Sequence, residues 1–129
     1  MKIRWLLQDA VVVVQEELIL DFGGTNGVRD PGLLDSALAR PKNLHAYDKK
    51  ASIFRLAASY AFGIAKNHPF VDGNKRTALT IAAVFLEMNG QDFRADEAEC
   101  VVIFNQLASG EVTEKELSKW FEKNSKKAF

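Results

Sequence analysis

The side chains with the clearest capacity for chemistry lie together in the segment His68-Pro69-Phe70-Val71-Asp72-Gly73-Asn74-Lys75-Arg76. An apolar stretch that favours a buried helix begins at about Gly73, so Lys75 and Arg76 fall in or beside its first turn. A helix N-terminus presents free N–H groups and a partial positive charge, so it normally favours acidic side chains over basic ones. A bound anion would explain both cations, and Gly73 would let that anion approach the backbone. The segment therefore predicts an anion site at the start of this helix.

Two further side chains of the segment suggest what the anion is and what happens to it. A polyphosphate suits the two cations, and Asp72 could hold Mg²⁺ against it, since that ion is usually bound by one or two carboxylates together with phosphate oxygens. His68 could accept a proton near neutral pH. The sequence thus indicates phosphate chemistry that uses Mg²⁺.

Each of these residues also has an ordinary structural explanation. Asp72 could cap the helix, Gly73 could relieve a turn, and the two cations could form a solvated face. A lone histidine such as His68 is more often hydrogen bonded than catalytic. The clustering of all these groups within nine residues favours the functional interpretation. A zinc hydrolase is disfavoured, because two histidines and one cysteine provide too few ligands for a closed zinc site.

Composition limits the other classes of function. The chain has 129 residues, of which 47% are apolar, and this size predicts one globular domain over residues 1–129. Its 17 basic and 17 acidic residues cancel, so we expect neither direct nucleic-acid binding nor a membrane partner. Cys100, the only cysteine, cannot form an internal disulfide and is expected to be buried among apolar neighbours. No apolar run approaches the roughly 20 residues of a membrane span, and we expect a cytoplasmic protein.

Hydrophobic periodicity places the segment between two strongly apolar helices. From Ala51 to Asn67 the apolar residues recur at intervals of three and four, and Pro69 requires this helix to end. The second helix runs from about Gly73 to Asn89-Gly90 and has apolar residues on nearly every side. This second pattern predicts a central, buried helix directly after residues 68–76, which we call the chemical segment.

Four more helices complete an all-α prediction of about six helices with little strand. The expected ranges are residues 10–22 after a cap at Asp9, Pro31–Arg40 ended by Pro41, Ala95–Leu107, and Thr113–Lys123 with Thr113 and Glu116 as a capping box. The four valines at 11–14 also suit a strand, but the length of the pattern favours a helix. Residues 41–50, which include His45, are expected to form an exposed loop, and residues 125–129 are expected to fray.

The chemical segment resembles the signature of Fic-domain proteins, His-Pro-Phe-x-Asp/Glu-Gly-Asn-Gly-Arg-x-x-Arg. The sequence departs from it at Lys75, where the signature has glycine, and at Leu79, where it has a second arginine. The run Asn74–Leu79 is similar to the death-on-curing (Doc) branch of the Fic superfamily, the toxins of bacterial toxin–antitoxin pairs. The stretch Gly27–Pro41 is similar to another segment of that branch, Arg-Asp…Gly-Leu-Leu…Ser-Ala-Leu-Ala-Arg-Pro. The resemblance covers nearly the whole chain and implies the Fic fold.

The resemblance also implies an activity. Standard Fic enzymes transfer a nucleotide monophosphate from a nucleoside triphosphate to a protein hydroxyl. Doc-type members bind the nucleotide turned round and transfer the terminal phosphate of ATP instead. Lys75 offers a physical reason, because a long cation in place of glycine fills the space that an inner phosphate would use. The family's target is a threonine of translation elongation factor Tu, whose phosphorylation arrests translation and growth.

The resemblance assigns roles to individual residues of the segment. His68 would be the base that accepts the threonine proton, and Asp72 would bind Mg²⁺. The phosphates of ATP would be held by Gly73, Asn74, Lys75 and Arg76, with Lys75 also acting in catalysis. Lys66 is a weaker candidate for the same anion, since a lysine at a helix end also complements the helix dipole.

A toxic activity requires restraint, and the resemblance implies a cognate antitoxin protein as a partner. Some Fic proteins carry an inhibitory Ser/Thr-x-x-x-Glu-Gly/Asn helix, but the nearest match, Ser118 to Glu122 followed by Lys123, lacks the last element. An antitoxin laid in a surface groove therefore fits better. Two alternatives stay open: nucleotidyl transfer to a protein hydroxyl, and a catalytically idle module that binds its antitoxin as a co-repressor. Binding of nucleic acid through Lys75 and Arg76 is disfavoured by the zero net charge.

Overall fold

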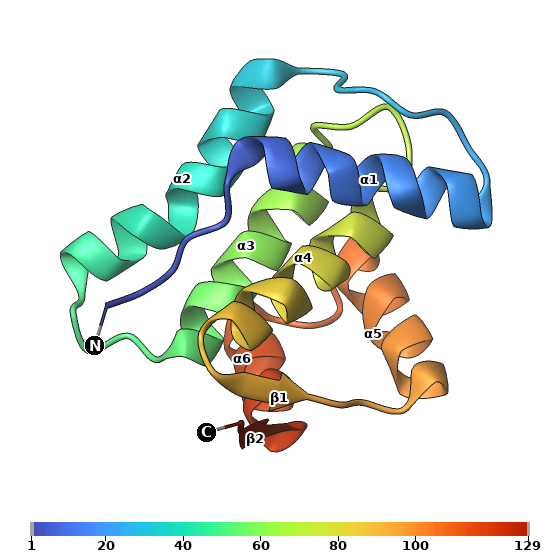
Figure 1. Ribbon diagram of the computed structural model, residues 1–129. Helices are drawn as coiled ribbons and strands as arrows, with labels where there is room; N and C mark the ends of the chain where they lie inside the picture. Colours follow the sequence, from blue (N-terminus) through green and yellow to red (C-terminus); the bar gives the residue numbers. More distant parts are fainter. Residues whose placement is uncertain (1, 129) are drawn as a thin grey trace.

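The computed structural model describes residues 2–128, and its helices confirm the all-α prediction. The elements within these residues are α1 (Gln8–Phe22), α2 (Pro31–Tyr47), α3 (Ile53–Asn67), α4 (Asn74–Met88), β1 (Gln91–Phe93), α5 (Glu97–Ser109), α6 (Glu114–Lys123) and β2 (Ser125–Lys127). Figure 1 shows α3 and α4 side by side in the middle of the molecule, with α1 across one side of them and α5 and α6 on the other. The chemical segment is the loop that joins these two central helices.

The core forms around α3 and α4. The run Leu56–Ala65 of α3 is buried without a break, and it packs against α2, α4 and α6. The apolar residues of α4, including Ala78, Ile81 and Phe85, are also buried, as the sequence pattern predicts. Tyr60 fixes the segment before α1 to this core, since its hydroxyl accepts a hydrogen bond from the Leu6 N–H at 3.2 Å. The loop between α3 and α4 is thus held at both ends by buried helices.

Pro41 lies inside α2 and does not end it. A proline in a helix interior costs about 3 kcal/mol, because it removes a hydrogen bond and crowds the preceding turn. Packing outweighs this cost here, since Pro41 is buried and Leu44, one turn later, packs against the core. The prediction of an exposed loop is therefore wrong for residues 41–47, and His45 lies on the helix with its ring 5.8 Å from that of Trp5.

The C-terminal residues also differ from the prediction. Instead of fraying, β2 pairs antiparallel with β1, with Phe93 opposite Ser125. The pairing is favoured because the Phe93 ring packs edge-on against Phe121, at 5.5 Å between ring centroids. The Ala128 N–H continues the contact by donating to the Gly90 carbonyl at 2.8 Å. Phe129, which was included in the prediction, lies outside the described residues.

Helix ends mostly follow the local signals of the sequence. Asp30, Ser52 and Thr113 accept hydrogen bonds from first-turn amides of α2, α3 and α6, and the predicted capping box of α6 is present. The prediction for Asp9 is wrong, because α1 begins at Gln8, two residues earlier than predicted, and Asp9 lies in its first turn. Cys100 is half-buried rather than buried, and desolvation, followed by its acidic neighbours on α5, raises the pKa of its thiol.

None of the helices in the described part of the chain is long and apolar enough to cross a bilayer.

Candidate active site

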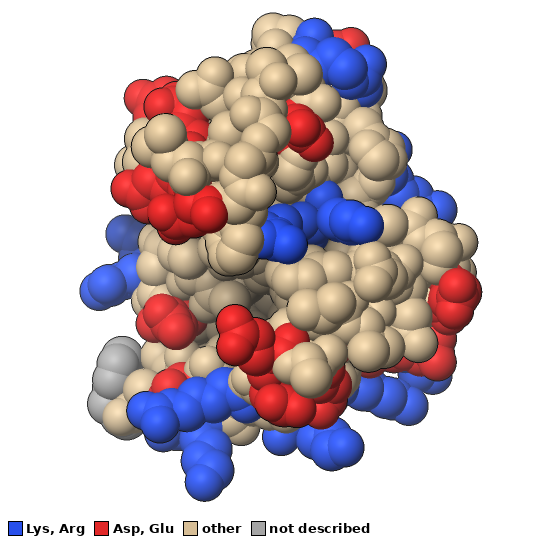
Figure 2. Space-filling view, turned by 90° about the vertical axis from the view of Figure 1, so that its right-hand side faces the viewer, with Lys and Arg blue, Asp and Glu red and all other residues tan. Residues whose placement is uncertain are grey.

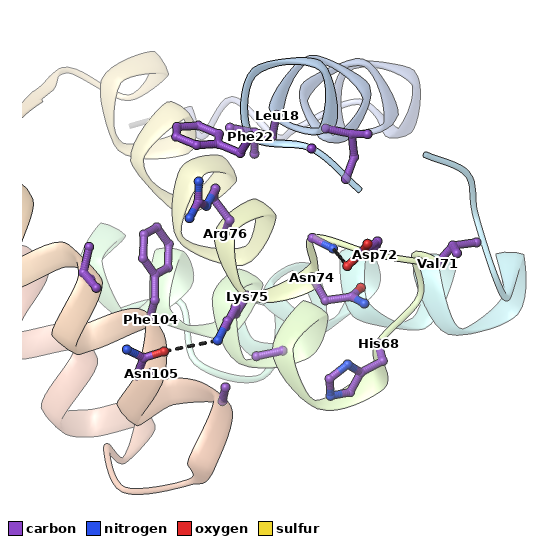
Figure 3. Close-up of a pocket in the computed structure, with 16 residues that line it drawn as sticks. Leu18, Phe22, His68, Val71, Asp72, Asn74, Lys75, Arg76, Phe104 and Asn105 are labelled. Atoms are coloured by element: carbon purple, nitrogen blue, oxygen red, sulfur yellow. Dashed lines mark hydrogen bonds between the residues drawn. The ribbon is translucent and has the colours of Figure 1, made fainter. Parts of the chain in front are cut away.

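A cavity of about 570 Å³ lies at the loop between α3 and α4. Its walls come from α1 (Leu18, Ile19 and Phe22), from the chemical segment (His68 and Val71–Arg76) and from α5 (Val101, Phe104, Asn105 and Ala108). Figure 2 shows basic side chains in a hollow on this face of the molecule, with acidic side chains above and below. Six of the seven residues predicted for the site line the cavity, and Lys66 is the exception (Figure 3).

His68 lies at the exposed end of α3 and has an uncommon backbone conformation. Its φ of 48° and ψ of 55° place it in the left-handed region, and it is the one non-glycine residue with positive φ among residues 2–128. This conformation ends the helix and turns the chain toward the cavity. Backbone strain of this kind occurs at functional sites, where the surrounding structure has to hold it.

The loop before α2 holds the chemical segment from outside. The amides of Arg29 and Asp30 both donate to the Pro69 carbonyl, at 2.7 and 3.1 Å. The Val71 N–H donates to the Gly27 carbonyl at 3.0 Å, and together these bonds form an antiparallel bridge. The second stretch of the predicted resemblance therefore has a clear structural task, which is to order the backbone beside His68.

Asn74 holds the same segment from inside. Its side-chain oxygen accepts from the Phe70 N–H and its side-chain nitrogen donates to the Phe70 carbonyl, both at 3.0 Å. The Phe70 side chain is buried, so this pair of bonds links the loop to the core. Both polar atoms of the Asn74 side chain are thus engaged with backbone, and the group that it presents at the helix start is its backbone N–H.

Asp72 presents an exposed carboxylate beside the start of α4. One oxygen accepts from the Gly73 N–H at 3.0 Å and the other lies 3.4 Å from the Thr25 N–H. Its carbonyl accepts from the Gln15 side chain at 3.1 Å. Gly24 lies close to the Asp72 carboxylate, since a Cβ built on Gly24 would be 2.6 Å from one of its oxygens.

These surroundings fit a Mg²⁺ ion that is held by one carboxylate. The part of the chain that the structure describes contains no cluster of three or more His, Cys, Asp or Glu side chains able to bind a metal. An all-protein metal site is therefore not formed. Mg²⁺ usually keeps several waters and takes one or two carboxylates together with phosphate oxygens, and Asp72 beside the α4 amides suits that pattern.

The start of α4 is open. Its N-cap is Gly73, with φ of 72°, which has no side chain to accept from the first-turn amides. The first turn, Asn-Lys-Arg-Thr, contains two cations and no acid. The N-terminus of α4 therefore offers free N–H groups, the positive end of the helix dipole and two cations to the same cavity.

The two cations extend in different directions from this helix start. The Lys75 ammonium crosses the cavity and donates to the Asn105 side-chain oxygen on α5, at 3.1 Å (Figure 3). The Arg76 guanidinium lies over the Phe22 ring at 3.8 Å and also faces Phe104 at 6.0 Å. Helices α1 and α5 thus hold the two charges apart at the mouth of the cavity.

Lys66 is the one predicted site residue that lies elsewhere. It is exposed in the last turn of α3, and it is not among the residues that line the cavity in the described structure. Its position matches the structural alternative, a cation that complements the negative end of the helix dipole.

Sequence reasoning missed the residues that other elements bring to the site. Gln15 is completely buried, and its polar position directly after four valines was the only signal for it. Phe22, Phe104 and Asn105 come from α1 and α5, and nothing in the local sequence indicates which cation each would meet. Only the packing of the helices around the cavity identifies them.

Comparison with known proteins shows which family the chain is similar to. The sequence matches the Fic/DOC family over residues 5–86, which is more than half of the chain. The chain belongs to the Fic/DOC family. It is 46% identical over 93 residues to "Toxin Doc" of Mycolicibacterium smegmatis, which covers 68% of this chain and 70% of that protein. It is 32% identical over 111 residues to "Protein kinase doc" of Escherichia phage P1, which covers 85% of this chain and 86% of that protein.

Membership of the Fic/DOC family confirms the predicted resemblance and accounts for the fold. The matched residues extend from the segment before α1 through most of α4, and so include the whole chemical segment. They end before α5. The Fic/DOC match therefore does not include Phe104 and Asn105, which contact the two cations of α4.

Proposed function

We propose that this chain is the toxin of a toxin–antitoxin pair and that it acts as an ATP- and Mg²⁺-dependent protein kinase. Its target would be a threonine of translation elongation factor Tu, whose phosphorylation would arrest translation. The printed names of the two relatives, a Doc toxin and a Doc protein kinase, support a toxin and a phosphotransferase. The threonine and the elongation factor come from the family resemblance of the chemical segment.

The observation that carries the proposal is the open, cationic start of α4. A helix N-terminus with a glycine N-cap, no first-turn acid and two lysine or arginine side chains is unfavourable unless an anion is bound there. The cavity of about 570 Å³ lies within the range of small-molecule sites. Its apolar walls from α1 and α5 would suit the nucleoside part of ATP, while the α4 amides would bind the phosphates.

Lys75 and Leu79 favour transfer of the terminal phosphate over transfer of the nucleotide. The Lys75 side chain fills the space between the α4 start and α5 that glycine would leave open. Leu79, at the position of the second Fic arginine, is 3% exposed and belongs to the core, so this position provides no further cation for the outer phosphates. Both features argue against the standard Fic orientation of the nucleotide.

The residues of the site account for each part of the transfer. His68 would accept the proton of the threonine hydroxyl as its oxygen forms a bond to the terminal phosphorus, and the bond from that phosphorus to ADP would break. Lys75, Arg76 and the α4 amides would stabilise the negative charge on the phosphate oxygens. Asp72 would hold Mg²⁺, which neutralises charge on the phosphates when it is bound. The protein forms no covalent bond, so its contribution is positioning and charge neutralisation.

Restraint by an antitoxin follows from the same proposal. A toxic kinase requires an inhibitor in its own cell, and the segment Ser118–Lys123 does not complete the inhibitory pattern found in some Fic proteins. We therefore propose a separate antitoxin protein that binds this chain in the cytoplasm, where the elongation factor is also found.

Label transfer from ATP tests the proposal. Purified protein is incubated with elongation factor Tu, Mg²⁺ and ATP labelled at either the α or the γ phosphate, and the target is analysed by intact mass and by mapping of the modified residue. We expect γ label on one threonine, and none with the His68→Ala variant. Label from the α phosphate would instead establish the nucleotidyl transferase alternative. No label in either case, with growth arrest by His68→Ala, would support the idle antitoxin-binding module.

A further inference from the structure

Arg29 makes contacts that the proposed reaction does not yet explain. It lies in the loop before α2, within the second stretch of the family resemblance, and its side chain is largely exposed. The guanidinium Nε donates to the His68 carbonyl at 2.8 Å, and a terminal nitrogen donates to the Asn67 carbonyl at 3.0 Å. The Arg29 backbone N–H donates to the next carbonyl, that of Pro69, at 2.7 Å. A single residue thus binds three successive carbonyl oxygens around His68.

Two of these carbonyls, those of Asn67 and His68, lie at the end of α3, where a helix leaves its last carbonyls without helical partners. The last carbonyls of a helix carry the negative end of its dipole, so a cation that donates to them is favourable. A planar guanidinium can bind two of them at once in a fixed geometry. Asn67 is in turn fixed to α2, since its side chain donates to the Leu33 carbonyl at 3.0 Å.

The left-handed backbone of His68 gives these hydrogen bonds from Arg29 a purpose. With φ of 48° this residue has a left-handed conformation that is uncommon for residues other than glycine, although histidine adopts it more often than most. Relaxation of His68 toward an extended or right-handed backbone would change the direction of its imidazole, which lines the cavity in this structure. The Arg29 bonds on both sides of the His68 peptide unit oppose that relaxation.

We propose that Arg29 is a positioning residue for His68, which holds the left-handed end of α3 and so keeps the imidazole at the cavity. The inference rests on the proposed function of His68 as the base for phosphate transfer. Arg29 itself does not line the cavity in the described structure and need not touch the nucleotide or the target. Its effect is transmitted through the backbone of residues 67–69.

Two substitutions at Arg29 and one control test the role through activity. Arg29→Met removes the guanidinium, and Arg29→Lys keeps the charge but loses the double contact. The control is Arg55→Met, which removes an exposed arginine on α3 that pairs with Asp48 at 3.1 Å. We expect kcat to fall about tenfold or more in both Arg29 variants, with little change in KM for ATP, because the phosphate-binding groups of α4 are untouched. Arg55→Met should keep wild-type kcat.

A second readout does not depend on the reaction. Carbon–proton NMR spectra of the His68 ring, and hydrogen exchange of the Val71 amide, report the state of the loop directly. In the wild-type protein we expect one ring environment and a protected amide, because the Val71 N–H is bonded to Gly27. In Arg29→Met we expect several ring environments and faster exchange at Val71, while amides in the middle of α3 stay protected. Arg29→Lys supplies the same measurement if Arg29→Met does not fold.

The outcomes separate this inference from the proposed function. Unchanged kcat, ring signals and Val71 exchange in the Arg29 variants would overturn the positioning role while leaving the kinase proposal intact. Failure of the wild-type protein to transfer phosphate would overturn the kinase proposal, whereas the NMR result would still decide whether Arg29 holds His68. A rise in KM for ATP at constant kcat would contradict the inference, because it would place Arg29 in nucleotide binding.

Discussion

The N-termini of α4 and α6 have a lysine at the same helical position but opposite surroundings. In α6, Lys115 stands between Glu114 and Glu116, and Thr113 completes a capping box in which both bonds are formed, at 2.9 and 3.1 Å. In α4, Lys75 follows a glycine N-cap and stands in a first turn that contains no acid.

The difference fits the proposal that the start of α6 serves stability and the start of α4 serves a ligand. The amides of α6 are bound by its own side chains, and two acids balance the dipole, so this end is satisfied within the chain. The amides of α4 are offered to a cavity together with two cations. Ser, Thr, Asp or Asn at the N-cap of α4 would bind its first-turn amides, as Asp30, Ser52 and Thr113 do at α2, α3 and α6.

The largest effect should come from removing the proposed base beside the open helix start. In His68→Ala we expect phosphate transfer to fall by about 10²–10⁴-fold, because the threonine proton then has no acceptor at the site. Kinetics of γ-phosphate transfer measure this. The other histidine provides the control, since His45 lies on α2 against Trp5, and His45→Ala should retain activity as long as it folds. Equal losses in the two variants would argue against a special role for His68.

Replacement of each of the two matched lysines by methionine tests the comparison directly. Lys75→Met should weaken ATP binding by about 10–100-fold, since a charge-assisted hydrogen bond to phosphate is lost. Lys115→Met, at the same position of α6, should leave ATP binding unchanged. Isothermal titration calorimetry with ATP and Mg²⁺ measures both. A similar loss of affinity in the two variants would mean that α4 has no particular role in binding the nucleotide.

Two neighbouring glycines test the position of Asp72. Gly23 and Gly24 both have positive φ, but a Cβ at Gly24 would displace the Asp72 carboxylate, whereas within the described structure a Cβ at Gly23 would meet no atom within 4 Å. Both alanine variants should lose some stability through backbone strain, about 1–3 kcal/mol. Only Gly24→Ala should also require more Mg²⁺, about tenfold, for half-maximal transfer. Identical Mg²⁺ dependence in both variants would remove Asp72 from the proposed metal site.

A substitution at the N-cap of α6 should lower the stability of the protein without changing its activity. Thr113→Ala removes the capping side chain of α6 and should lower the free energy of unfolding by about 1 kcal/mol. Chemical denaturation measures this loss, and the rate of phosphate transfer at a temperature where both proteins are folded should not change. A marked loss of activity would show that the two helix starts are not independent.

The smallest expected effect is a change in how stability depends on acidic pH. Hydrogen bonds from the Thr113 N–H and hydroxyl lower the pKa of Glu116 below the ordinary range for glutamate. The folded state therefore favours the ionised form, so this contribution to stability is present at neutral pH and is lost as the pH falls through the lowered pKa. Denaturation curves at a series of acid pH values should show a smaller pH dependence for Glu116→Gln than for the wild-type protein. Parallel curves would contradict this assignment.

Local signals predicted the elements of the fold well, and the exceptions have tertiary causes. Asp30 and Thr113 act within three residues of their own positions, so these two caps could be recognised from the sequence. The continuation of α2 through Pro41 depends on burial of that proline against other helices. The pairing of β1 with β2 depends on the core contact of Phe93. No local pattern contains this information.

The same distinction applies to the site. The nine consecutive residues 68–76 carried the prediction, since they cluster polar and charged groups and since Lys75 and Arg76 conflict with an ordinary helix start. The contacts of Lys75 with Asn105 and of Arg76 with Phe22 join residues far apart in the chain, and only the packing of α1 and α5 around α4 defines them. Arg29 was visible as part of a family segment, but its proposed role rests on the left-handed backbone of His68, which the sequence did not indicate.

The central claim is that the start of α4 binds a nucleotide. Titration of the protein with ATP and Mg²⁺, followed by proton–nitrogen NMR of the amides at the starts of α4 and α6, tests it most directly. The amides of Asn74, Lys75 and Arg76 should shift in a saturable way, and those of Glu114, Lys115 and Glu116 should not move. Saturable shifts at α6 with none at α4, or no shifts at either end, would contradict a nucleotide site at the start of α4.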